Sequence, residues 1–251
     1  MITKYLLIFV TGYLLGNFYF YNENTVKYKY DKNEKYKNVL LHSLRYYIIN
    51  IFVILPVLSL DMLLAATYIA LTHFIIDTVK YIYLINSKNI KKIRVFVTSQ
   101  CAHLASILIL AYIMDCWNFS IGHIRIVDNI LNTYGFNPEK LIRWILAVLF
   151  IHEPVNNFIQ IFLDDYKPGK KDKIIIKTDN KAGRRIGTIE RLIMIIFLST
   201  DQYTAIGFIL TAKSIARYDR ITKDEKFAEY YLLGTLISTL CVIVCRKIIL
   251  I

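Results

Sequence analysis

Long apolar blocks separated by short basic stretches constrain this chain more than any other feature. A helix that crosses the hydrocarbon core of a bilayer needs roughly 17–25 mostly apolar residues, and six blocks in the sequence have about this length. Hydrophobic residues make up 56% of the 251 residues and charged residues 20%, which excludes intrinsic disorder and argues against a fold surrounded by water. The sequence therefore predicts a membrane protein.

The blocks predict an all-α polytopic transmembrane helical bundle, formed as a single integral membrane domain over residues 1–251. It should contain about six full spans and a hairpin of two short helices, divided by Asp201 and Gln202. The expected full spans are residues 5–21, 39–60, 61–85, 95–117, 141–163 and 229–251, and the expected short helices are residues 188–200 and 203–216. Because Pro154 lacks a backbone donor, the fifth span should be kinked or broken there.

The amino-terminal block resembles a signal peptide in one respect, since a single Lys precedes a short apolar core. No small-x-small cleavage site follows this block. We therefore interpret residues 5–21 as a retained first helix, with a cleaved signal peptide as the alternative.

The formal charge of +12 is concentrated between the apolar blocks, at residues 27–37, 88–94, 167–187 and 217–226. This distribution is typical of cytoplasmic loops beside spanning helices. Residues 167–187 should form a basic cytoplasmic loop. The basic residues after 216 return to the same side only if residues 188–216 form a hairpin, and whether that hairpin spans the bilayer or re-enters it stays open.

Several partners and cofactors are disfavoured by the same sequence. The basic residues lie in the loops and not on one face, which favours anionic lipid headgroups over nucleic acid. The four cysteines form no C-x-x-C pair, and no P-loop, dinucleotide fingerprint, H-E-x-x-H or G-x-S-x-G motif occurs. We expect membrane lipid as a partner and no nucleic acid, and the missing nucleotide motifs argue against nucleotide-driven transport by this chain alone. The cofactor stays open, with a divalent metal such as zinc as the candidate. A protein partner or a homo-oligomer stays open.

Polar residues inside the spans point to a site. A charge at bilayer depth costs from about 2.5 kcal/mol upward, so such residues usually face the bundle interior or mark function. His73 and Asp77 are four apart and share a helix face, while His42 and His103 belong to the preceding and following spans. These four residues are the candidate metal or catalytic residues, and imidazole and carboxylate suit zinc or another divalent ion. Polar packing between helices is the favoured interpretation of these residues, and a metal or catalytic site and proton or ion handling are the alternatives.

Charged residues in the carboxyl-terminal third form a second candidate cluster. They are Glu190, Arg191, Lys213, Arg217 and Glu229, which should meet near the cytoplasmic face if residues 188–216 form a hairpin. An ion-pair network that fixes the hairpin is the favoured interpretation. A clamp for a lipid headgroup, with cations on the phosphate, is the alternative.

Several segments resemble a bacterial membrane-protein family catalogued as domain of unknown function 3307. They are LLGNFYFYNENT, NVLLHSLRYY, LTHFIIDTVK and, more strongly, GTIERLIMIIFLSTDQYTAIGFILTAKSIARY and EYYLLGTLIS. The resemblance covers most of the chain apart from residues 118–140 and 167–181. It implies a multi-pass bacterial inner-membrane protein and no established activity, cofactor or partner.

The same resemblance bears on the candidate site. His42, His73, Asp77 and His103 match later polar positions of the family. In its first-helix motif, of the form HLLGDF, Tyr13 and Asn17 stand where the family has His and Asp. An asparagine coordinates a cation through its carbonyl but brings no charge, which weakens the case for a metallohydrolase.

Three classes of function fit these observations. The first is a structural, partner-binding or lipid-binding protein of the inner membrane with an intramembrane His/Asp cluster near the cytoplasmic face. The second is a metal-assisted membrane hydrolase that acts on a lipid or lipid-linked substrate. The third is a small cation or proton transporter. The sequence alone does not decide whether the protein is an enzyme.

Overall fold

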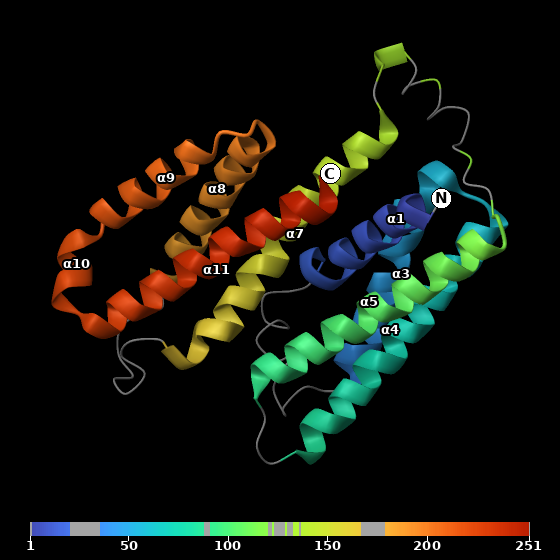
Figure 1. Cartoon of the computed structure of the whole chain (residues 1–251). Helices are drawn as coiled ribbons and strands as arrows, with labels where there is room; N and C mark the ends of the chain where they lie inside the picture. The colour runs from blue at the N-terminus through green and yellow to red at the C-terminus, as the bar shows by residue number, and fades with distance from the viewer. Residues whose placement is uncertain are drawn as a thin grey trace. The chain divides into compact units, whose positions relative to one another are not determined.

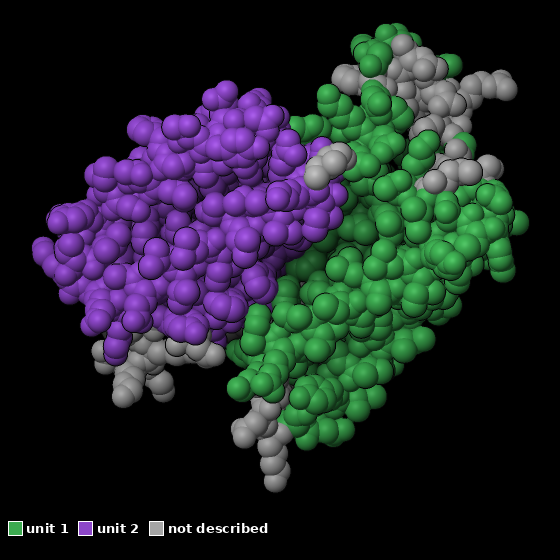
Figure 2. Space-filling view, viewed as in Figure 1, with its two compact units in different colours: residues 1–146 green, residues 147–251 purple. Residues whose placement is uncertain are grey.

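Helices account for every regular element in the part of the chain that the computed structural model describes, and no strand occurs there. The described residues are 2–20, 36–87, 91–119, 122, 129, 133–135, 137–166 and 179–250. Figure 1 shows the helices, and Figure 2 shows the two compact units into which the chain divides, Met1–Leu146 and Ala147–Ile251.

The first unit is built around four helical segments. Its elements are α1 (Ile2–Leu14), the π-helix η1 (Leu15–Tyr19), α3 (Tyr36–Ile54), the 3-10 turn η2 (Leu55–Val57), α4 (Leu60–Asn86) and α5 (Lys92–Cys116). α4 packs against α3 and α5, and α1 packs against the same two helices. Helices α1, α3, α4 and α5 therefore enclose a common interior.

A tight turn joins α3 to α4, as the apolar pattern on either side of it predicts. Pro56 fits the 3-10 turn η2, because its fixed φ and missing donor suit a short turn after a helix. Ser59 then starts α4, since its hydroxyl accepts a hydrogen bond from the backbone N–H of Met62 at 3.2 Å. The turn makes α3 and α4 antiparallel neighbours.

Two glycines allow the close packing of α1 against α3. A Cβ atom at Gly16 would lie 2.5 Å from Cδ2 of Tyr46, and one at Gly12 would lie 2.4 Å from Oδ1 of Asn50. The glycines are four residues apart, which is the small-residue spacing that brings membrane helices together. Their lack of side chains leaves room for Tyr46 and Asn50, both of which are buried.

Replacing Gly16 with alanine is expected to destabilise the protein by about 1–3 kcal/mol, because the new methyl group overlaps the buried ring of Tyr46. Gly207→Ala is the control, since nothing lies within 4 Å of a Cβ atom at Gly207. Alanine there should be neutral or stabilising by up to about 1 kcal/mol, as in any helix interior. Unfolding in mixed micelles measures both variants, and equal unfolding midpoints would contradict the close contact.

The second unit contains the end of α7 (Pro138–Phe162) and four further helices. Its other elements are the 3-10 turn η3 (Leu163–Tyr166), α8 (Asp179–Ser199), α9 (Tyr203–Ile215), α10 (Tyr218–Lys223) and α11 (Glu225–Ile249). α8 packs against α9 and α11, and α10 packs against α11. The expected division at Asp201 and Gln202 is the turn between α8 and α9.

Arg246, from α11, caps the carboxyl-terminal end of α8. The Nε of Arg246 donates a hydrogen bond to the carbonyl oxygen of Leu198 at 3.3 Å, and its Nη2 lies 3.6 Å from Asp201 Oδ1. Asp201 itself has a φ of 57°, in the left-handed region that reverses the chain after a helix. A basic group near the last carbonyls of a helix also suits the helix dipole.

The predicted all-helical architecture is confirmed for the described residues, with helices that can cross a membrane. Within the described ranges, five helical segments are long and apolar enough, namely Tyr36–Val57, Leu60–Asn86, Lys92–Cys116, Pro138–Phe162 and Glu225–Ile249. They coincide with five of the six expected full spans. In the sixth, α1 is followed directly by η1.

Two local features differ from the expected ones. α8 begins at Asp179, inside the segment that was expected to be a basic loop. Its residues 182–186 are exposed. An exposed helix accepts polar side chains as readily as a loop does, so the basic composition did not distinguish the two. α7 continues through Pro154 and is not broken there. A proline removes one backbone hydrogen bond of a helix, here the bond to the carbonyl oxygen of Phe150, and the helix continues on both sides of Pro154.

Candidate metal centre

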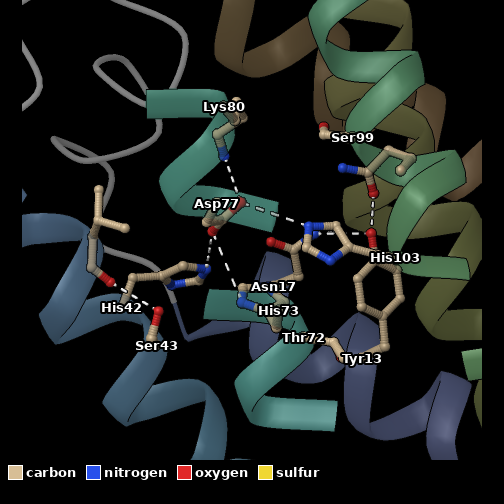
Figure 3. Close-up of polar contacts among 12 residues, drawn as sticks. Tyr13, Asn17, His42, Ser43, Thr72, His73, Asp77, Lys80, Ser99 and His103 are labelled. Atoms are coloured by element: carbon tan, nitrogen blue, oxygen red, sulfur yellow. Dashed lines mark hydrogen bonds and ion pairs between the residues drawn. The ribbon is translucent and has the colours of Figure 1, made fainter. Parts of the chain in front are cut away.

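Asp77 lies at the centre of a buried cluster in the first unit. His73, Asp77 and Lys80 lie on the inward face of α4, at helical spacings of four and three residues. His42 comes from α3 and His103 from α5. Figure 3 shows the side chains of all three histidines directed toward the Asp77 carboxylate. The three histidines and Asp77 are each at most 4% exposed.

The distances around the carboxylate are specific. Asp77 Oδ2 lies 3.6 Å from Nε2 of His42 and 3.9 Å from Nδ1 of His73, and Oδ1 lies 3.6 Å from Nε2 of His103. Direct N–H···O hydrogen bonds measure about 2.7–3.2 Å. Two ligand atoms on one tetrahedral zinc ion are about 3.3 Å apart, because each bond is roughly 2.0–2.2 Å. The spacing is thus closer to that of shared ligands than to that of hydrogen-bonded pairs.

Three of these residues form a compact ligand set. One ligand atom each from His42, His73 and Asp77 lie within 4.8 Å of one another. Two imidazoles and one carboxylate suit zinc and other divalent transition ions. His103 contacts the other carboxylate oxygen of Asp77, Oδ1. The cluster could therefore hold a metal through three protein ligands, with His103 beside it.

Lys80 forms an ion pair with the Oδ1 atom of Asp77. Its Nζ lies 2.7 Å from Asp77 Oδ1, and its side chain is almost fully buried. The two oxygens of Asp77 therefore differ in their surroundings. Oδ1 contacts the ammonium group and His103, while Oδ2 faces His42 and His73.

Aromatic stacking fixes the position of His73. Its ring lies between Tyr46, at a centroid distance of 3.8 Å and an interplanar angle of 17°, and His103, at 4.4 Å and 20°. Tyr46 in turn packs against the backbone of η1 at Gly16. The packing of η1 on α3 thus determines the orientation of a candidate metal ligand on α4.

A hydrogen-bonded chain from the first helical segment reaches the same cluster. Asn17 Nδ2 donates to Tyr13 Oη at 3.1 Å, and Tyr13 Oη donates to Gln100 Oε1. The Tyr13 ring lies 5.5 Å from the ring of His103. Asn17 belongs to the π-helix η1. π-Helical turns are rare in proteins, but those that occur often lie at functional sites. Tyr13 and Asn17 therefore belong to the surroundings of His103.

Tyr46, Gly16 and the contact of Lys80 with Asp77 were not predicted from the sequence. Tyr46 follows His42 by four residues, so helical spacing alone places both on one face of α3. The signal for Gly16 was its spacing from Gly12. For Lys80 the signal was its place three residues after Asp77.

Three of the five carboxyl-terminal charges meet at the ring of Tyr231, because Lys213 lies 5.5 Å from its centroid, pairs with Glu190 and shares the ring with Arg217. Lys213 Nζ lies 2.5 Å from Glu190 Oε2, which joins α9 to α8. Arg217 lies over the ring of Tyr231 at 5.8 Å. Glu229 is exposed.

Arg191 is the buried member of this group, and its hydrogen bonds go to neutral acceptors. Its Nε donates to the carbonyl oxygen of Ile151 at 2.6 Å, and its Nη2 donates to Asn156 Oδ1 at 2.5 Å. Its Nη1 donates to Ser238 Oγ at 3.1 Å. These contacts join α7, α8 and α11.

A comparison with known protein families finds a match to most of the first unit. The model of the family described as protein of unknown function DUF3307 matches residues 5–128. Residues 5–128 are thus similar to DUF3307, a domain of unknown function. The matched DUF3307 segment contains α3, α4, α5 and η1 in full and α1 from Tyr5 onward, and with them every residue of the candidate metal centre. No curated protein and no solved structure matches the chain.

The extent of the family match differs from the expected one. The resemblance was expected to extend over most of the chain and to be more specific in its carboxyl-terminal part. The DUF3307 match instead ends at residue 128, before α8, α9 and α11. The amino-terminal segments that carry the candidate ligands are inside the match.

Proposed function

We propose that the DUF3307 segment is a membrane-embedded metal-binding module that holds a divalent transition ion, such as zinc, through His42, His73 and Asp77. The single observation that supports it is the meeting of these ligand atoms within 4.8 Å in a buried interior. Three protein ligands leave one tetrahedral position open, which is the arrangement of catalytic zinc sites.

The activity that this arrangement favours is hydrolysis of a lipid or lipid-linked ester or phosphoester. A bound divalent ion lowers the pKa of a coordinated water and polarises the bond that is attacked. In the overall reaction the hydroxyl group of water joins the acyl or phosphoryl centre, and its proton leaves with the released alcohol. A substrate that resides in the bilayer fits a site enclosed by helices that can cross a membrane.

The depth of the cluster supports the cytoplasmic half of the bilayer as its place. His42 lies six residues after the start of α3, Asp77 nine before the end of α4 and His103 eleven after the start of α5. At about 1.5 Å per residue these positions are roughly 9, 14 and 16 Å from the helix ends. Lys37, Lys91, Lys92 and Arg94 lie at the same ends, which the positive-inside rule assigns to the cytoplasm.

Metal analysis of the full chain tests the proposal. We expect protein stripped with chelator and re-equilibrated with zinc in detergent to retain about one equivalent, measured by mass spectrometry of the metal. His42→Ala, His73→Ala and Asp77→Asn should each weaken zinc binding at least tenfold, since even outer partners of such ligands contribute about 10–100-fold. Zinc-loaded protein should hydrolyse bilayer lipid or a lipid-linked ester, and Asp77→Asn should not.

His152→Ala is the matched control. His152 lies on α7, and its Nε2 is 3.4 Å from Glu153, so it also pairs with a carboxylate, but at a partly exposed place. Zinc binding should be unchanged in this variant. If folded native protein binds no more zinc than folded Asp77→Asn, the metal proposal is wrong.

The contact of Lys80 with Asp77 favours a second candidate function, a purely structural cluster. An ammonium group 2.7 Å from the carboxylate already supplies the counter-charge that a buried acid needs. In that case the histidines serve only to pack α3, α4 and α5 together. The zinc titration separates the two candidates, because a structural cluster of this kind gains no stability from zinc.

A further inference from the structure

We propose that the corner between α9 and α11 binds the headgroup of an anionic phospholipid through Arg217 and Arg220. This site lies in the second unit and is independent of the metal centre. Figure 1 shows α10 at this corner, between the end of α9 and the start of α11.

The corner between α9 and α11 is expected to lie at the membrane surface, between the hydrocarbon core and water. α9 is a short apolar helix that ends at Ile215, and α11 is long and apolar enough to cross a membrane from Glu225 onward. The chain between these two apolar helices contains Arg217, Asp219, Arg220 and Lys223. Polar residues between two apolar helices are expected at the level of the headgroups.

Two aromatic rings hold the arginines in place. The guanidinium carbon of Arg220 lies 4.1 Å from the ring centroid of Phe227, and that of Arg217 lies 5.8 Å from the ring of Tyr231. Phe227 and Tyr231 are one turn apart on α11 and stack on each other at 6.1 Å. Stacking of this kind orients a guanidinium group without removing its charge. Two arginines are therefore presented side by side on one face of α11.

A hollow next to the arginines is large enough for a headgroup. It has a volume of about 590 Å³ and is lined by Ile215, Ala216, Arg217, Tyr218, Asp219 and Arg220, and small-molecule sites span about 300–1,000 Å³. Ile215 and Tyr218 are 69% and 65% exposed, so they offer apolar surface for the glycerol and the upper acyl chains.

The charges of the hollow favour an anion. Its wall carries two arginines against one acid, Asp219. Asp224 starts α11, where its carboxylate accepts a hydrogen bond from the N–H of Phe227 at 3.1 Å. Lys213 is paired with Glu190. A phosphate that bears a net negative charge matches the two planar arginine forks, which bind phosphate oxygens in pairs.

Native mass spectrometry of the full chain in detergent tests this site. Phosphatidylglycerol should bind the native protein at least tenfold more tightly than phosphatidylcholine. The double variant Arg217→Gln with Arg220→Gln should lose about tenfold or more in phosphatidylglycerol affinity, since each basic residue at a membrane surface contributes severalfold. Free glycerol phosphate at the same concentration should not compete, because it lacks the acyl chains.

A second double variant, which removes two positive charges elsewhere, tests whether the loss of affinity is specific to the two arginines. Lys91 and Lys92 are exposed at the start of α5. Lys91→Gln with Lys92→Gln should change phosphatidylglycerol affinity less than about twofold, because neither lysine lines the hollow. Arg220→Lys, which retains the charge but not the planar fork, should lose affinity to an intermediate extent. Equal losses in the two double variants, or equal binding of the two lipids by native protein, would overturn the proposal.

Discussion

Replacing Lys80 with methionine is expected to destabilise the metal-free protein by about 3–5 kcal/mol, which is the typical effect of removing one partner from a buried ion pair. Lys80 Nζ lies 2.7 Å from Asp77 Oδ1. Methionine fills a similar volume, so the loss comes from the carboxylate that is left without its counter-charge. Unfolding in mixed micelles with chelator present measures the change.

Zinc should restore much of that loss. An ion bound by His42, His73 and Asp77 supplies the positive charge that the variant lacks. At a free zinc concentration about one hundred times the dissociation constant, binding stabilises the folded state by about 2.7 kcal/mol. We therefore expect zinc to raise the unfolding midpoint of Lys80→Met at least as much as that of the native protein. A destabilised variant that gains nothing from zinc would identify the cluster as structural only.

The control for this variant is a second paired lysine in a less buried place. Lys213 forms an ion pair with Glu190 at 2.5 Å, but both side chains are partly exposed. Lys213→Met should therefore lose less stability than Lys80→Met, because solvent screens the remaining carboxylate. Zinc should have the same effect on this variant as on the native protein.

The convergence of polar side chains in the first unit could be predicted from the sequence, because bilayer depth forces such groups inward. Spacing on one helix placed His73 beside Asp77, and similar depth in the neighbouring spans placed His42 and His103 near them. The stacking of Tyr46 on His73 could not be predicted in the same way. It depends on how closely η1 approaches α3, and the absence of a side chain at Gly16 permits this approach. That the cluster holds a metal stays a prediction.

The second unit shows a limit of the same reasoning. Opposite charges at neighbouring helix ends predicted a shared network, and Glu190 and Lys213 do form a pair. Arg191, the next residue along α8, has different partners, because successive helical residues face directions about 100° apart. Its acceptors are a backbone carbonyl and neutral side chains, which carry no charge signal in the sequence.

Replacing Arg191 with methionine is expected to destabilise the second unit by about 2–4 kcal/mol. The variant leaves Oδ1 of Asn156 without its donor, and a buried unsatisfied acceptor costs about 1–3 kcal/mol. It also removes the hydrogen bonds that Arg191 donates to the carbonyl oxygen of Ile151 and to Ser238 Oγ, each of which contributes about 0.5–1.5 kcal/mol. Removal of a buried guanidinium recovers part of this, because the charge no longer has to be kept away from water.

Hydrogen exchange of the full chain locates the effect, and Arg184→Met provides the control. Arg184 is also on α8 and pairs with Glu153, but its side chain is 39% exposed, so its loss should cost less than about 1 kcal/mol. In Arg191→Met, exchange should accelerate in α7, α8 and α11, because Arg191 bonds to Ile151, Asn156 and Ser238. Equal exchange in the two variants would mean that the buried guanidinium does not hold these three helices together.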